Sequence, residues 1–342
     1  MKSDVTTKAI SAFSLNAIEG WTRQKCLLFV IGIVWPVWFC YMYLWDGWAL
    51  FSSIGFMSIT MAIGSFIAGA TAEGGGAIAF PAMTLIFNIS PSVARDFSLI
   101  IQAVGMNAAA LTIIATRTRV IWPAILFSGL GGSIGVTLGL MVFSGLLPPG
   151  LTKLFFVSFW VGFGFALWSA HHFFRNKEKL FSIQRLSYFN GFLLFAIGII
   201  GGITSGITGS GLDIVTFSVL TLYFRICPTV ATPTSVVLMG NNALIGALVK
   251  TGFMGGLSSQ SFDYWLVSVP IVVIGAPLGA IFMKARGQGF IVNMLISIIV
   301  IQFVGALCII PQTLTSLIFC FSTILLSICA YVFLIRYART DL

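Results

Sequence analysis

Twelve apolar runs, joined by short polar connections, take up most of this 342-residue chain. The runs fall at about 27–45, 48–70, 77–88, 97–116, 120–147, 151–174, 189–208, 212–224, 233–249, 264–283, 290–310 and 313–335. Ten of them are long enough to cross a bilayer as helices, whereas 77–88 and 212–224 are too short to cross alone. Only 8% of residues are charged, which is far below the share in soluble domains. We therefore predict an all-α polytopic membrane protein with about ten full transmembrane helices and two short broken or re-entrant segments.

The two short runs belong to a repeated pattern in which glycines interrupt apolar sequence. Residues 72–81 read AEGGGAIAFP and are followed by SPSVARDFS at 90–98. Residues 206–213 read GITGSGLD and are followed by CPTVATPTS at 227–235. Paired interrupted segments at matching positions of two halves are typical of transporters, where they mark a binding site near the membrane midplane.

Basic residues set the orientation of the helices. The loop at 171–185 is the richest in lysine and arginine, so we place it in the cytoplasm. Counting outward from it places both termini in the cytoplasm of a multi-pass inner-membrane protein, and the net charge of +9 then reports orientation rather than a nucleic-acid partner. The first membrane repeat, 48–174, enters from outside and the second, 189–310, from inside, which predicts an inverted repeat. The remaining parts are a cytoplasmic N-terminus with an additional helix (1–47), a basic linker (175–188), and a final helix with a cytoplasmic tail (311–342).

The glycine turns offer chemistry suited to an anion. Gly74, Gly75 and Gly76 in one half, and Gly209, Ser210 and Gly211 in the other, let one helix end and another begin with backbone amides uncovered. A helix start is positively polarised, so two of them can converge on one anion. The alternative is that these glycines only allow helices to cross closely, which we expect of the small-residue stripe Gly131, Gly135 and Gly139.

Polar side chains near the turns complete the candidate site. They are Thr204, Ser205 and Thr208 beside the second turn, with Gln102, Asn107, Asn241 and Asn242 on the helices that follow the two short segments. The hydroxyls can donate to a ligand or bond to carbonyls of the preceding turn. The amides can bind substrate or join neighbouring helices.

Charged groups within apolar sequence are further candidates. Glu73 and Asp213 adjoin the two turns and can carry protons, although Glu73 at an interface would be only a helix cap. Arg95 and Arg225 are expected in the loops after the short segments, where they draw anions to the two mouths or serve as interface anchors.

On the pattern of 73–81, with 91–98 and its echo at 228–235, the chain resembles the sulfite exporter TauE/SafE family from about Ser58 to Lys284. The resemblance implies a secondary transporter of sulfite, sulfoacetate or related sulfonates across the cytoplasmic membrane. The second half departs from the pattern, because Ser210 replaces the middle glycine and Thr216 stands where a proline is expected.

Other classes fit less well. A membrane protease needs a serine beside a histidine, or paired aspartates within helices, and neither pattern is present. The six cysteines have no zinc-like spacing, so we expect no metal and no cofactor. An anion channel of the same architecture remains the alternative to a carrier. The expected partners are a small anionic substrate, the lipid bilayer and a second copy of the chain in a homodimer, with no nucleic acid.

Overall fold

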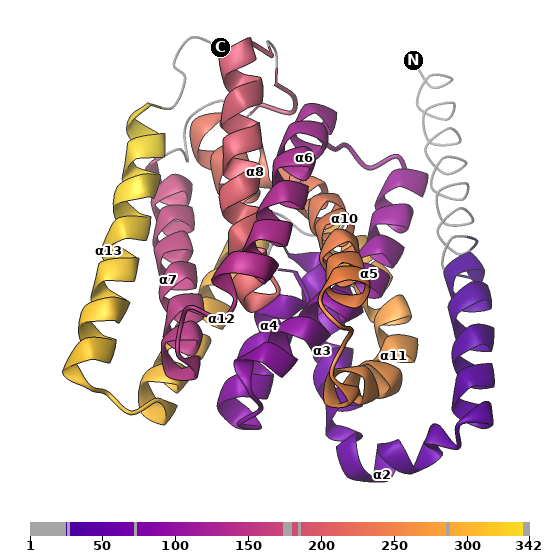
Figure 1. Ribbon diagram of the computed structural model, residues 1–342. Helices are drawn as coiled ribbons and strands as arrows, with labels where there is room; N and C mark the ends of the chain where they lie inside the picture. The colour runs from indigo at the N-terminus through magenta and orange to yellow at the C-terminus, as the bar shows by residue number, and fades with distance from the viewer. Residues whose placement is uncertain are drawn as a thin grey trace, which may run out of the picture.

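The computed structural model describes residues 25, 28–71, 74–173, 180–183, 186–284 and 288–337, which form a bundle of helices (Figure 1). In this part of the chain, eight helices are long and apolar enough to cross a membrane. They are α5 (Pro91–Ala115), α6 with its π-helical extension η3 (Trp122–Phe143), α7 (Pro149–Phe173), α8 (Tyr188–Thr208), α10 (Pro228–Phe253), α11 (Ser259–Lys284), α12 (Gln288–Ile309) and α13 (Leu314–Arg336). The all-helical, multi-pass prediction is confirmed.

The predicted number of about ten full spans is not confirmed, because the first two apolar runs do not form two straight helices. The helix Leu28–Leu44 is followed by a turn at Asp46, whose φ of 47° is left-handed, and the chain then bends by 102° into Gly47–Ile54. Within the latter lie η1 (Gly47–Ala49) and α2 (Leu50–Ile54). A further break at Gly55 leaves α3 (Phe56–Ala70) with only 15 residues. At most nine spans result in the described residues, if the bent pair counts as one.

The two short runs form short helices, as predicted. After α3 and the first glycine turn come α4 (Gly76–Pro81) and a π-helical turn, η2 (Ala82–Ile86). After α8 and the second glycine turn come α9 (Leu212–Ser218) and a π-helical turn, η4 (Val219–Tyr223).

Each short helix turns back along the helix before it. The ring of Phe87, which follows η2, lies 4.2 Å from the ring of Phe56 at the start of α3. The carbonyl oxygen of Arg225, which follows η4, accepts a 3.0 Å hydrogen bond from the amide of Leu180 in the linker before α8. The two segments, α3 to η2 and α8 to η4, are therefore helical hairpins, which we call the first and second hairpin.

The ends of the two hairpins match residue for residue. The π-helical turns begin at Ala82 and Val219, and the residues with positive φ after them are Asn88 and Arg225. The next helices begin at Pro91 and Pro228, where proline is favoured because the missing N–H has no helical partner. All three pairs are separated by 137 residues. This register corrects the sequence alignment, because it places Ser218, and not Thr216, opposite Pro81.

The helices that follow the hairpins, α5 and α10, pack antiparallel at the centre of the bundle (Figure 1). Asn107 Nδ2 donates to the carbonyl oxygen of Gly240 at 2.9 Å near the middle of the pair. Asp96 near the start of α5 contacts Lys250 near the end of α10. Because the first hairpin leads into the start of α5 and the second into the start of α10, the two hairpins open toward opposite ends of this pair. We call these the Ser90 end and the Pro228 end.

The remaining helices hold the hairpins in place. α3 packs along α11 and α8 along α6, so each hairpin rests on a helix from the other half. The glycine stripe on α6 permits the second contact, because side chains at these positions would strike carbonyl oxygens of α8. α7 covers both short helices through buried aromatic contacts, with Phe156 on Phe80 and Phe163 on Phe217. The glycine turns are thereby fixed within the bundle.

Candidate functional site

The two glycine turns, far apart in the sequence, meet beside α5. A Cβ atom on Gly76 would lie 2.7 Å from Gln102 Nε2, 2.9 Å from Ser210 Cβ and 3.0 Å from the carbonyl oxygen of Gly209. A Cβ atom on Gly74 would strike the carboxylate of Asp213. Only glycine fits at either position, and at Gly74 the φ of 69° also favours it. The structure thus brings the two predicted half-sites together.

Gln102 joins α5 to the second turn. Its Nε2 donates 2.8 Å hydrogen bonds to the carbonyl oxygens of Ser98 and Gly209. Its Oε1 is buried and accepts no hydrogen bond from the residues that the structure describes.

The hydroxyls of the second turn hold the backbone in shape. Gly209 ends α8 with a φ of 88°, and Ser205 Oγ accepts from the amide of Leu212, the first residue of α9, at 3.0 Å. Thr208 Oγ1 donates to the carbonyl oxygens of Thr204 and Ser210. Thr204 itself donates to Ile200 in the preceding turn of α8. In this conformation both threonines follow the alternative in which hydroxyls bond back to their own helix.

Asp213 occupies the helix start that was expected to receive an anion. Its Oδ1 accepts from the amides of Gly211 at 3.1 Å and Ile214 at 3.0 Å, and Oδ2 lies 3.4 Å from Ser210 Oγ. The side chain is fully buried. A carboxylate is stabilised at a helix start by the free amides and the helix dipole. The sequence carries a signal for this role, since acidic residues favour the first turn of a helix.

The other predicted residues are spread over the bundle. Glu73 lies outside the described residues. Asn107 bridges α5 and α10 through Gly240, and Asn241 is exposed. Asn242 is buried, and within the described part of the chain neither its amide nitrogen nor its oxygen has a hydrogen-bond partner. Its Oδ1 would lie 3.1 Å from a Cβ on Gly132, a position that also faces the side chain of Leu212 at the start of α9.

The prediction that Arg95 lies in a loop is wrong, because Pro91 already starts α5. Arg95 is buried in this helix and contacts Asp96 Oδ1 through Nε at 2.9 Å and Nη2 at 2.7 Å. Lys250 Nζ lies 3.3 Å from Asp96 Oδ2. Sequence reasoning missed Asp96 as a partner, although adjacent opposite charges in apolar sequence were the available signal. Arg225 does lie in the loop after the second hairpin, half-buried, with a φ of 54°.

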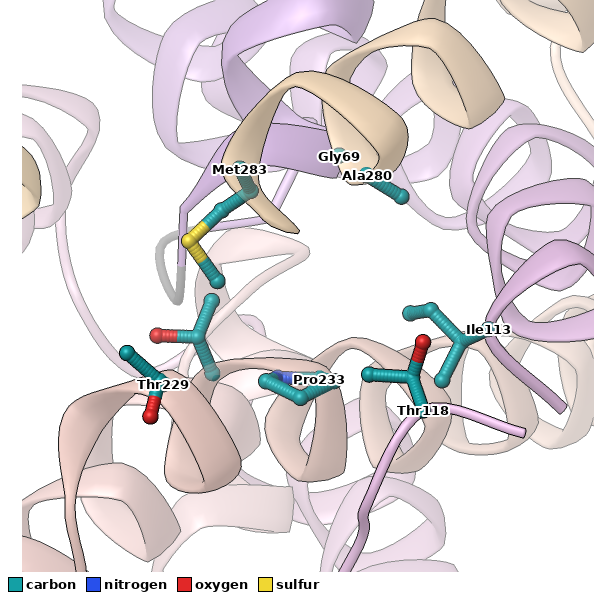
Figure 2. A pocket seen from close by; sticks show the side chains of 8 residues that line it. Gly69, Ile113, Thr118, Thr229, Pro233, Ala280 and Met283 are labelled. Carbon is teal, nitrogen blue, oxygen red and sulfur yellow. The ribbon is translucent and has the colours of Figure 1, made fainter. Parts of the chain in front are cut away.

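A cavity of about 90 Å³ opens at the Pro228 end of the bundle, below the tip of the first hairpin (Figure 2). Its lining consists of Gly69, Ile113, Thr118, Thr229, Thr232, Pro233, Ala280 and Met283. In Figure 2, Met283 and Ala280 face Pro233 and Thr118 across the opening. Gly69 is close to the end of α3, so the cavity reaches from this end toward the first glycine turn. A much smaller cleft of about 10 Å³ adjoins Gly75 and Gln102.

The described residues contain no group of three His, Cys, Asp or Glu side chains able to hold a metal ion. The arrangement instead resembles the interrupted helices that bind substrate in membrane transporters. No curated protein and no solved structure matches the chain. The model of one family, described as sulfite exporter TauE/SafE, matches residues 56–308, which include both hairpins, α5 and α10. The chain belongs to the sulfite exporter TauE/SafE family, whose members are membrane transporters of sulfur-containing anions.

Proposed function

We propose that the protein is a secondary transporter of a small anion, sulfite or an organosulfonate, and that the anion binds where the two glycine turns meet. The observation that carries the proposal is the direct contact of Gly74 and Gly76 with Ser210 and Asp213, beside Gln102. Two hairpins that enter from opposite ends and meet at their tips place one site within reach of both sides of a membrane. Family membership supports the choice of a sulfur-containing anion.

Transport then proceeds by alternating access. The segments 48–174 and 189–310 act as an inverted repeat, in which each hairpin rests on a helix of the other half. The cavity at the Pro228 end gives one face access toward the site. Arg117, Arg119 and Lys284 lie near this end, so we place it in the cytoplasm together with both termini.

The anion is held by neutral groups and helix starts. The amides of Gly76 and Ala77 begin the helix Gly76–Ile86, which itself provides no acceptor for them. Ser210 Oγ adds a hydroxyl donor from the other hairpin. Asp213 fills the start of α9 in this conformation. The anion therefore binds either beside the Asp213 carboxylate or in its place at the start of α9.

The test is uptake and counterflow in proteoliposomes with labelled sulfite, sulfoacetate and a panel of carboxylates, with and without a pH gradient. A carrier gives saturable flux that shows counterflow. Large, ohmic and unsaturable flux would assign the protein to the anion channels, and absence of any anion movement would refute the proposal.

Proton coupling is tested in the same vesicles. We propose that Glu73 and Asp213 are the groups that carry protons, so Glu73→Gln and Asp213→Asn should each reduce the stimulation of uptake by a pH gradient. Asp263→Asn, half-buried near the start of α11, is the matched control and should leave it intact. If both site variants keep the full pH dependence, neither carboxylate is the coupling group.

A further inference from the structure

Three charged side chains are packed together at the Ser90 end of the central helix pair. Arg95 and Asp96 are 5% and 4% exposed, and the side chain of Lys250 is 15% exposed. Arg95 and Asp96 follow one another on α5, whereas Lys250 comes from α10. The contact of 3.3 Å between Lys250 Nζ and Asp96 Oδ2 is therefore the one that joins the two helices within this group, which we call the charge cluster.

The charge cluster carries two positive groups and one negative group. An unbalanced charge is costly to bury, and the cost falls when an anion of matching geometry lies beside it. Arg and Lys are also the side chains that bind oxyanions most strongly. The charge cluster is thus suited to bind a small external oxyanion. The oxyanion can either replace the carboxylate of Asp96 or bind beside it.

The residues equivalent to the charge cluster line the cavity at the Pro228 end of the helix pair. The separation of 137 residues that relates the hairpin ends carries Arg95 to Thr232, Asp96 to Pro233 and Ile113 to Lys250. Thr232, Pro233 and Ile113 all line the cavity of about 90 Å³. Charged side chains therefore fill the Ser90 end at positions whose equivalents line a cavity at the Pro228 end.

The charge cluster also adjoins the second glycine turn. A Cβ on Gly209 would lie 2.6 Å from Ser98 Cβ and 2.9 Å from the carbonyl oxygen of Arg95. An anion that left the charge cluster along α5 toward the middle of the bundle would meet this turn and Gln102, which donates to the Gly209 carbonyl.

We propose that Arg95 and Lys250 form an access site for small oxyanions at the Ser90 end, and that Asp96 fills this site while the carrier is open at the Pro228 end. Opening the Ser90 end breaks the contact between Asp96 and Lys250, because only this contact crosses from α5 to α10 within the charge cluster. The incoming oxyanion then replaces the carboxylate as the partner of Lys250. This inference rests on the proposed function and adds a second site to it.

Cysteine labelling tests the gate without requiring transport. The variants are made in a full-length chain whose six cysteines are replaced. Ser98→Cys reports access to the space between the charge cluster and the second glycine turn, and Thr118→Cys reports access to the cavity. Lys250→Met removes the contact between helices and leaves Arg95 and Asp96 as a balanced pair. Labelling rates with a polar maleimide are measured on purified protein, and full labelling after denaturation shows that each cysteine is reactive.

We expect slow labelling of Ser98→Cys alone and a rise of at least about tenfold when Lys250→Met is added, with slower labelling at Thr118→Cys, because the two-state equilibrium shifts. Asp263→Asn, a neutralised carboxylate near the same end, should change neither rate. Unchanged rates in Lys250→Met, in protein that elutes as a folded monodisperse species, would overturn the gate.

Protection by a ligand tests the access site itself. The probe is sulfoacetate, because sulfite reacts with maleimides. Asp96→Asn leaves both cations in place, so sulfoacetate should slow labelling of Ser98→Cys in this variant, and adding Arg95→Gln should remove that protection. If Asp96→Asn fails to fold, the protection is measured in the otherwise unchanged Ser98→Cys protein against Arg95→Gln. Protection that persists without Arg95 would overturn the site, whereas a wild-type protein that moves no anion would refute only the proposed function.

Discussion

Gly76→Ala is the smallest change that tests whether contact between the hairpin tips is needed. Gly76 is the first residue of α4 and has ordinary helical geometry, so alanine strains no backbone angle. The new methyl group would lie within 3.0 Å of three atoms, on Gln102, Ser210 and Gly209. The Gly209 atom is a backbone carbonyl oxygen at a turn that cannot shift freely. The methyl group must therefore push the hairpins apart.

The magnitude follows from the crowding. Ordinary contacts of a methyl carbon are about 3.5–4.0 Å, so all three distances fall short by at least about half an ångström. Overpacking of this kind costs about 1–3 kcal/mol. The gain in helix propensity from glycine to alanine is at most about 1 kcal/mol and is smaller at a helix start. We expect a net loss of about 1–2 kcal/mol and a larger loss of anion binding, because the methyl group also covers the amides at the start of α4.

The assay compares Gly76→Ala with Gly305→Ala by thermal unfolding in detergent and by sulfoacetate binding. Gly305 lies inside α12, and no atom from another described segment stands within 4 Å of the place that an alanine methyl group would take there. The Gly305→Ala variant should therefore be neutral or slightly more stable than the wild type. If Gly76→Ala unfolds and binds like Gly305→Ala, the tips do not meet as closely as the structure indicates and the site must lie elsewhere.

Three further changes probe neighbouring contacts. Gln102→Leu leaves the Gly209 carbonyl without its side-chain donor and should lower the stability measured by thermal unfolding by about 1–3 kcal/mol. Gln102→Glu retains the shape but places a carboxylate beside that carbonyl, so it should lower the stability further. Asp213→Ala removes the acceptor for two amides and should cost about 1–2 kcal/mol, whereas Asp213→Asn retains an acceptor oxygen and should cost less, as measured by denaturation midpoints. Gly135→Val forces a side chain onto a carbonyl of α8 and should cost about 3 kcal/mol, seen as loss of monodisperse protein on size exclusion.

The sequence was sufficient to predict the elements whose cause is local. Apolar length fixes which segments can be helices, and the two short runs became short helices within a residue or two of the predicted bounds. Pro91 and Pro228 are equally local signals of a helix start, because proline fixes φ and lacks an N–H, but the predicted runs began only at 97 and 233 and missed them. The small residues on α6 predicted that another helix approaches it closely, since their effect depends only on size, but they did not identify that helix as α8.

Features that depend on the meeting of distant segments were beyond the sequence. The break at Gly55 divides the run 48–70, which reads as one span, and nothing in its hydropathy marks the break. Asp96, the partner of Arg95, is its neighbour in sequence. The contact between Asp96 and Lys250, in contrast, exists only because α5 and α10 pack antiparallel. Asp213 could be recognised as functional, yet its hydrogen bonds to the amides at the start of α9 could be predicted only by knowing where that helix begins.

The ends of the two hairpins match in register but carry different residues at equivalent positions, and this difference predicts where the anion binds. Counting by 137 residues, Gly76 at the start of α4 corresponds to Asp213 at the start of α9. Asp213 fills its own helix start with a carboxylate, whereas Gly76 has no side chain that could do the same for α4. Two anions in one small site would repel each other. We therefore expect the substrate to lie nearer α4, with the second hairpin contributing Ser210 rather than its helix dipole.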